Sequence, residues 1–198
     1  MGLDKRLVFE YDDEGISLYI SYEGKSILYK SWKIIGAMIH NNLFTEKPFL
    51  DRRVEQFADY VYATFDEDRK QGRMKSFGDY YYPAMVSVCT DVKFRFLSEG
   101  YSDSPDAVEY GKTSMLSTME TDFYKGKSIK NAGSFKEASM CAHPLGQCAE
   151  QHAANDLLQQ KGASYLDVKT DIFFSKAVRP VSGKEYDPCP NCKKLFNL

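Results

Sequence analysis

Cys148-Ala149-Glu150 and Pro188-Cys189-Pro190-Asn191-Cys192 are the two most informative stretches of this sequence, and each is predicted to begin a helix. In the first helix Gly162 is a natural C-terminal stop. In the second, Asp187 is a suitable N-cap and Pro188 a suitable first helical residue. A strand is predicted between them, over Ile172–Val178. The apolar side of the first helix is marked by Ala149, Ala153, Leu157 and Leu158.

The segments before Cys148 extend this alternation of helices and strands. Apolar residues at helical spacing predict an amphipathic helix that begins near Asp51. Ala84–Cys89 is predicted to be a buried strand, and Phe94 and Phe96 alternate with charges as in a half-buried strand. The order is helix, strand, strand, helix, strand, helix, which predicts an α/β layered fold. The apolar positions of the first helix are Val54, Phe57, Ala58, Val61, Tyr62 and Phe65.

The N-terminal region has a different pattern. Three apolar or aromatic runs are separated by short segments that contain Gly and Asp or Glu, which predicts a β-meander. The runs are Leu7–Tyr11, Ile16–Tyr22 and Ile27–Tyr29. We therefore expect an N-terminal extension over residues 1–48 and a main domain over residues 49–198. The long irregular stretch Tyr101–Leu145 directly precedes Cys148, and its length is typical of a functional loop or lid.

Composition narrows the possible partners. The chain has 26 Lys and Arg against 28 Asp and Glu, a net charge of -2, and 43% hydrophobic residues. Near-neutrality does not favour a protein that binds nucleic acid by charge alone. No apolar stretch approaches the length of a membrane span, and the N-terminus lacks the apolar region of a signal peptide. These features predict a soluble cytoplasmic protein with no membrane partner.

The cysteine pattern predicts metal binding. Five cysteines are present, an odd number, which favours a reducing compartment over a disulfide framework. Cys189 and Cys192 place two thiolates on one side of a turn, and Cys148 begins a second helix. Three protein ligands leave the fourth tetrahedral position of Zn²⁺ for water, which is typical of catalytic sites. Glu150, in the exposed first turn, is the candidate that takes a proton from this water.

The two stretches resemble the zinc-dependent cytidine-deaminase superfamily, whose pattern is His or Cys, any residue, Glu, and later Pro-Cys-x-x-Cys. The resemblance covers roughly residues 51–198. It implies a three-layer α/β core, Zn²⁺ held by Cys148, Cys189 and Cys192, and Glu150 as the catalytic acid and base. The long loop and the N-terminal extension resemble divergent bacterial toxin or effector deaminases, which would be delivered into a target cell.

Two other interpretations of the cysteines stay open at this point. His152 lies four residues after Cys148 and would complete a closed structural Cys3His site, in a module that binds a protein partner. Alternatively, Cys148 is buried and Cys-x-x-Cys is redox-active. Of the two remaining cysteines, Cys89 is interpreted as a core residue and Cys141 as a free loop thiol. The three tyrosines Tyr80–Tyr82 are interpreted first as packing residues and second as a stacking platform for a base.

The expected activity is hydrolytic deamination of a nucleobase, most simply cytosine. The candidate substrates are a nucleoside, a nucleotide or single-stranded nucleic acid, framed by the loop Tyr101–Leu145 with help from Tyr80–Tyr82. Hydrolysis of another amine or amide by the same zinc and water unit is a further possibility. An immunity protein or other protein partner fits the effector-type resemblance. The sequence assigns no substrate-binding residue and no oligomeric state.

Overall fold

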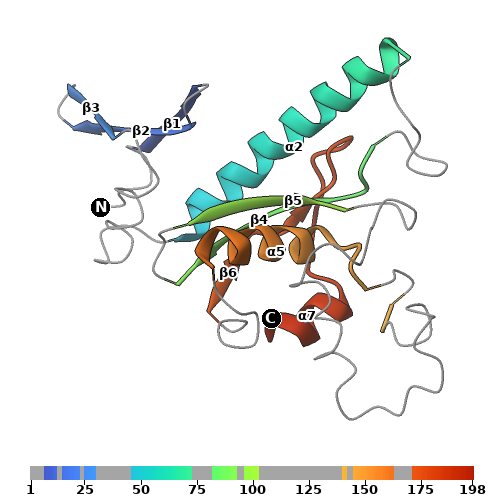
Figure 1. Cartoon of the computed structure of the whole chain (residues 1–198). Coiled ribbons are helices and arrows are strands. Elements are labelled where there is room, and N and C mark those ends of the chain that lie inside the picture. Colours follow the sequence, from blue (N-terminus) through green and yellow to red (C-terminus); the bar gives the residue numbers. More distant parts are fainter. Residues whose placement is uncertain are drawn as a thin grey trace, which may run out of the picture.

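The computed structural model describes residues 7–12, 15–22, 25–29, 46–72, 82–92, 96–102, 140–141, 145–162 and 171–198. Before residue 49 the structure describes the backbone alone. Most of the predicted loop Tyr101–Leu145 lies outside the described residues. In the described part, helices and strands alternate as expected of a mixed α/β protein (Figure 1).

The predicted β-meander is confirmed. β1 (Leu7–Asp12), β2 (Gly15–Tyr22) and β3 (Lys25–Tyr29) form a three-stranded antiparallel sheet in the order β1-β2-β3. The register pairs Phe9 with Leu18, and Ile20 with Ile27. The turns at residues 12–15 and 22–25 are short, which fixes this register because a hairpin of given loop length allows one pairing.

A second antiparallel sheet forms the centre of the molecule. β4 (Val86–Asp91) is fully buried and pairs with β5 (Leu97–Tyr101) on one side and with β6 (Ile172–Phe174) and β7 (Ala177–Val178) on the other. β8 (Glu185–Tyr186) extends the sheet beyond β7. The predicted buried strand is therefore confirmed, at Val86–Asp91 instead of Ala84–Cys89.

The strand predicted over Ile172–Val178 is interrupted. Cys89 of β4 pairs with Phe174 of β6, and Val86 of β4 pairs with Val178 of β7. The two paired positions are three residues apart along β4 but four residues apart along the β6–β7 segment. The extra residue makes a β-bulge. Ser175 stabilises it, because its backbone N–H donates to Val88 O at 2.9 Å and its hydroxyl accepts from Val88 N–H at 3.0 Å.

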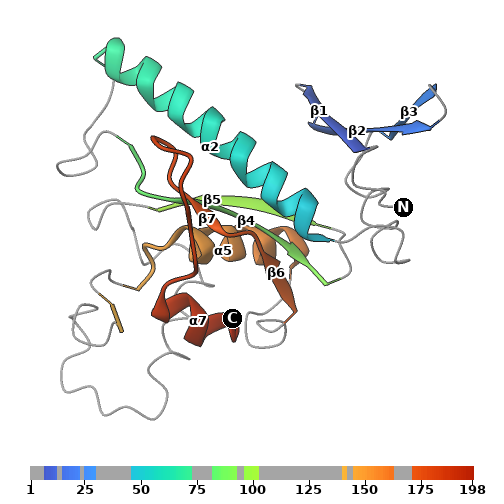
Figure 2. The same cartoon turned by 180° about the vertical axis from the view of Figure 1, so that it is seen from behind.

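One face of this sheet is covered by α2 (Glu46–Lys70) (Figures 1 and 2). The helix begins five residues before the predicted Asp51 and includes Pro48. Pro48 is the third residue of the helix, where a backbone N–H has no intrahelical acceptor, so its missing N–H is tolerated. The core on this side joins α2 to β4 and β7 and consists of Leu50, Val54, Phe57, Ala58, Val61, Val86, Val88 and Val178.

The opposite face is covered by α5 (Ala149–Lys161) and α7 (Pro190–Phe196) (Figure 2). Alternation along β4 separates the two cores, since Val86 and Val88 face α2 while Cys89 faces α5 and α7. The sheet is therefore the middle of three layers. Among the described helices, none is both long enough and apolar enough to cross a bilayer.

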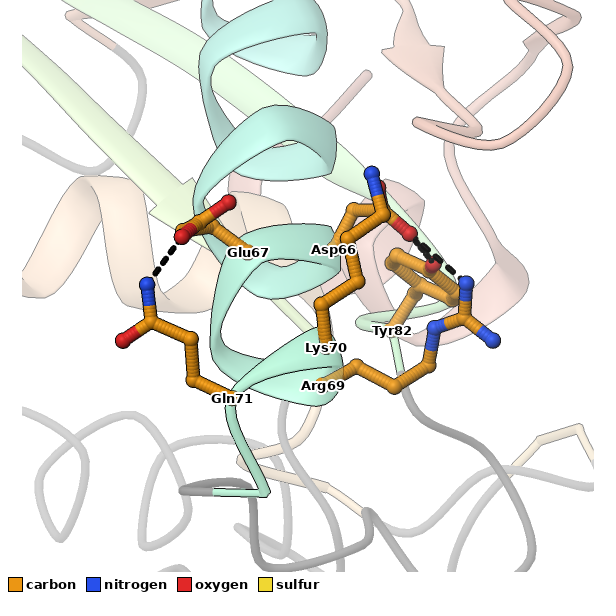
Figure 3. A network of polar contacts seen from close by, with 6 residues as sticks. All are labelled: Asp66, Glu67, Arg69, Lys70, Gln71 and Tyr82. Atoms are coloured by element: carbon orange, nitrogen blue, oxygen red, sulfur yellow. Dashed lines mark hydrogen bonds and ion pairs between the residues drawn. The ribbon is translucent and has the colours of Figure 1, made fainter.

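The exposed end of α2 carries a polar network (Figure 3). Asp66 accepts hydrogen bonds at 2.9 Å from both Arg69 and the hydroxyl of Tyr82, and it forms a 2.6 Å ion pair with Lys70. The Tyr82 ring also stacks on Tyr62. The packing interpretation of Tyr82 is therefore confirmed. Tyr80 and Tyr81 lie outside the described residues.

Candidate metal centre

Three cysteines meet where α5 and α7 begin. The sulfurs of Cys148, Cys189 and Cys192 all lie within 4.8 Å of one another, an arrangement that could hold a metal ion. Cys148 Sγ lies 3.3 Å from Cys189 Sγ, which in turn lies 3.6 Å from Cys192 Sγ. The fold thus brings together the three residues that the sequence predicted as ligands.

The position of Cys148 is set by the start of α5. Cys148 is the N-cap of this helix, with extended backbone angles and no side-chain capping hydrogen bond, so its sulfur is free to face the other two. Gly100 of β5 fixes the height of the first turn above the sheet. A Cβ at Gly100 would lie 2.3 Å from Ala153 N and 2.4 Å from Ala149 O, so only glycine allows α5 to pack this closely.

Cys189 and Cys192 are positioned by α7. Cys189 is the N-cap and Pro190 the first helical residue, so the helix begins two residues later than the predicted Pro188. Pro188 and Pro190 both satisfy the preference for proline at the first position of a helix, so this preference alone does not choose between them. Burial of Leu195 and Phe196 selects the second, because this start turns the end of α7 into the core with Leu157 and Leu158.

Hydrogen bonds among the sulfurs divide the charge of the cluster unequally. The pKa of Cys189 is held well below its usual range by hydrogen bonds with Cys148 and Cys192 and by the backbone N–H groups of Cys192 and Asn191. The hydrogen bond with Cys189 raises the pKa of Cys148, and hydrogen bonds with Cys148 and Cys189 raise that of Cys192; burial adds to both shifts. A divalent cation would compensate the charge of further thiolates.

Glu150 is the carboxylate of the site. Its side chain is buried, and its Oε2 accepts a hydrogen bond from Cys192 Sγ at 3.6 Å. Burial raises the pKa of the Glu150 carboxyl to about 7, against the opposing effects of its own backbone N–H and of Cys192. The carboxyl group is thus next to the thiols and is poised to hold or release a proton near neutral pH.

Two buried amide side chains that the sequence analysis did not single out support the cysteines. Gln151 donates to Cys192 Sγ at 3.7 Å and accepts a hydrogen bond from the backbone N–H of Gly146. Asn191 accepts from Met140 N–H at 2.8 Å and donates to Cys141 Sγ at 3.2 Å. Cys141, interpreted as a free loop thiol, is therefore held against α7. Both amides adjoin predicted site residues in the sequence, which is the signal that could have identified them.

Two of the thiols and Glu150 open into a partly enclosed cavity of about 330 Å³. The metal centre contributes Cys148, Glu150 and Cys189 to its lining, and the β7–β8 hairpin contributes Arg179 and Tyr186. This volume is at the small end of the range for ligand sites, so it suits a small planar molecule and not a long groove-bound ligand.

His152 does not join the three thiols. It lines a larger cavity of about 590 Å³ between α2, β5 and α5, together with Arg53, Glu99 and Asp156. The closed structural Cys3His site, in which His152 would be the fourth ligand, is therefore not supported. Among the described residues, the three sulfurs alone form the cluster. Cys89 is buried in the core, as predicted.

No protein-family model matches the chain, and no curated protein or solved structure matches it either. The interpretation of the site depends on its own residues and geometry.

Proposed function

We propose that this protein is a zinc-dependent hydrolytic deaminase of a nucleobase, with cytosine as the preferred base. The observation that carries the proposal is the position of Glu150. A buried carboxyl group that is not one of the three clustered sulfur ligands opens into the same cavity as two of them, Cys148 and Cys189. A purely structural thiolate site has no use for such a group.

The donor set fits zinc. Thiolates are ligands that zinc prefers, and three protein ligands are typical of catalytic zinc sites, whereas structural sites have four. Cys148, Cys189 and Cys192 would hold the ion, and Gln151 would hold the sulfur of Cys192 in place. When bound, zinc supplies a water molecule whose pKa is lowered toward neutrality.

Glu150 would carry the protons of the reaction. Its carboxylate takes a proton from the attacking water and delivers it to the ring nitrogen of the base, then assists departure of the amine. The oxygen of water replaces the exocyclic nitrogen, so one C–N bond breaks, one C–O bond forms and ammonia leaves. A carboxyl group that lines the cavity beside the ligands can serve as base and acid in turn.

The arrangement of the main domain also supports the proposal. The helix, strand, strand, helix, strand, helix order implied by the deaminase resemblance corresponds to α2, β4, β5, α5, β6–β7 and α7. Both helices that begin at the cysteines lie on one face of the sheet, as the two half-motifs require for a shared metal. The fold assignment to this superfamily is part of the proposal.

The test is deamination of cytosine-containing substrates by the zinc-loaded protein and its Glu150→Gln variant. The panel contains cytidine, CMP and short single-stranded oligonucleotides, and ammonia and deaminated product are measured. We expect wild-type turnover and a loss of about 100-fold or more in Glu150→Gln, at unchanged zinc content. Glu67→Gln, on α2, is the matched control and should behave like wild type. A fully zinc-loaded wild-type protein that deaminates none of the panel would overturn the proposal.

A further inference from the structure

The β7–β8 hairpin presents two different faces. Ala177 pairs with Tyr186, and Val178 pairs with Glu185, so alternate residues point to opposite sides. On one side Val178 enters the core beneath α2, and Lys176 forms a 3.1 Å ion pair with Glu185. The other side faces the cavity of the candidate metal centre. It carries Ala177, Arg179, Lys184 and Tyr186, of which all but Lys184 line that cavity.

Two cations are gathered on the cavity side of the hairpin. The guanidinium carbon of Arg179 lies 5.1 Å, and the Lys184 ammonium 5.2 Å, from the centre of the Tyr186 ring. Within the described part of the chain, no carboxylate lies at ion-pair distance from either cation. Arg179 is therefore available to a ligand in the cavity, and Lys184 lies beside it on the same hairpin.

The turn that presents these cations is fixed by its backbone. Arg179 N–H donates to Lys184 O at 2.9 Å, and Arg179 O accepts from the N–H groups of Ser182 and Gly183 at 3.1 and 2.8 Å. Gly183 has a φ of 65°, a conformation that glycine adopts without strain. A pre-organised turn loses little conformational entropy when it binds a ligand.

Tyr186 has a specific part in this arrangement. Because Arg179 lies over its ring, that face of the ring is not free to stack on a base. The ring instead holds the guanidinium group by a cation–π contact and restricts its position. Arginine held in this way can form paired hydrogen bonds with a phosphate.

We propose that Arg179, assisted by Lys184, binds a phosphate group of the substrate, so that the substrate is a phosphorylated cytosine nucleotide and not the free base or nucleoside. This proposal rests on the function proposed above. It assigns different lining residues of one cavity to the two parts of a nucleotide, the base to Glu150 and Cys148 and the phosphate to Arg179.

The charge of the rim limits the number of phosphates. Asp187 also lines the cavity and follows Tyr186 directly. Arg179 is the cation among the lining residues, with Lys184 beside it on the hairpin, and Asp187 and Glu150 are the lining carboxyl groups. A monophosphate or a single phosphodiester brings one or two negative charges to the two cations, whereas a triphosphate brings several more toward Asp187 and Glu150 and would be repelled.

Direct binding tests the proposal without relying on turnover. Zinc-loaded Glu150→Gln protein is titrated calorimetrically with cytidine, CMP, CTP and a short oligodeoxycytidine that has no terminal phosphate. A charge-assisted hydrogen bond is worth about 10- to 100-fold in affinity. We expect CMP or the oligonucleotide to bind at least about 10-fold more tightly than cytidine, and CTP to bind more weakly than CMP. CMP as the tighter ligand would indicate a free nucleotide, and the oligonucleotide a polymeric substrate.

Variants of the hairpin provide the control. Arg179→Ala should remove the preference for the phosphorylated ligand and leave cytidine binding and zinc content unchanged, while Arg179→Lys should retain part of the preference. Lys176→Ala, on the other face of the same hairpin, should bind all ligands like the parent. Equal affinities for cytidine, CMP and the oligonucleotide, or a preference that survives Arg179→Ala, would overturn the phosphate assignment. Failure of the deaminase proposal is recognised separately, as an absence of turnover by the zinc-loaded wild-type protein.

Discussion

Replacement of Gly100 by alanine should separate β5 from α5 and disturb the metal centre at the same time. The added Cβ would lie 2.3 Å from Ala153 N and 2.4 Å from Ala149 O, whereas ordinary contacts begin at 3.4 Å. The helix must therefore move by about 1 Å. Both obstructing atoms belong to the backbone of α5, so no side-chain rotation relieves the contact.

This displacement has a predictable effect on stability. Overpacking of a core lowers the free energy of unfolding by about 1–3 kcal/mol, and we expect the upper end because Ala153 and Leu157 would also lose contacts with the sheet. For a protein of this size, 3 kcal/mol corresponds to a fall in melting temperature of about 6–12 °C. The loss is large against a total stability of about 5–15 kcal/mol.

The same displacement should weaken metal binding. Ala149 belongs to the turn that carries Cys148 and Glu150, and α7 carries the other two sulfurs. Coordination distances tolerate deviations of only about 0.2 Å. A shift of about 1 Å between the two helix starts therefore exceeds what a bound ion accepts, and zinc affinity should fall with stability.

Thermal and urea unfolding, followed by circular dichroism, measure the first effect, and competition with a zinc chelator measures the second. Gly72→Ala is the matched control. Gly72 has a φ of 66° and no atom within 4 Å of an added Cβ, so only its backbone conformation is strained, by about 1 kcal/mol. A Gly100→Ala protein as stable as Gly72→Ala, with wild-type zinc affinity, would refute the close approach of α5 to β5.

Three further predictions concern the metal, the core and pH. Cys192→Ser should lose most of its zinc as measured by metal analysis, and full zinc retention by the variant would contradict the ligand assignment. At a free zinc concentration of 100 times Kd, zinc should stabilise the wild-type protein by about 2.7 kcal/mol, and a chelator should remove this stabilisation. Leu195→Ala should lower the free energy of unfolding by about 2–5 kcal/mol in urea titrations, whereas Leu198→Ala, at a 45% exposed side chain, should change it little. The pKa of Asp66 is held well below its ordinary value of 3.8 by hydrogen bonds from Lys70, Arg69 and Tyr82. The stabilising effect of ionised Asp66 is therefore present above pH 3.8 and is lost as the pH falls further. The difference in melting temperature between wild type and Asp66→Asn should shrink from pH 7 to pH 3, and a constant difference would contradict this linkage.

Local patterns predicted the parts of the site that depend on short sequence spans. The two thiols of Cys-x-x-Cys are close because they are three positions apart in the sequence, and Gly162 ends α5 with a left-handed φ of 62°, as expected. The clustering of Cys148 with them was predicted from the family resemblance, since spacing alone does not fix a contact across 41 residues. Where two local rules gave equal answers, as at Pro188 and Pro190, the tertiary packing of Leu195 made the choice.

Features that depend on pairing between distant segments were not predicted. The two-residue strand β8 is too short to show a period, so the hairpin that places Arg179 and Tyr186 in the cavity was missed. The bulge at Ser175 depends on a hydrogen bond with Val88, 87 residues away. The importance of Gly100 is likewise invisible in the sequence, because it arises from the distance between a strand and a helix.

The packing of α7 explains how two of the three clustered thiols are positioned. A seven-residue helix is not stable alone, so tertiary contacts must hold it. Leu195 and Phe196 are buried, and the ring of Phe196 lies 4.8 Å from that of Phe174 on β6. At the other end, Asn191 ties the helix start to residues 140–141. Since both ends of α7 are anchored by the protein, the positions of Cys189 and Cys192 follow from the packing of the helix.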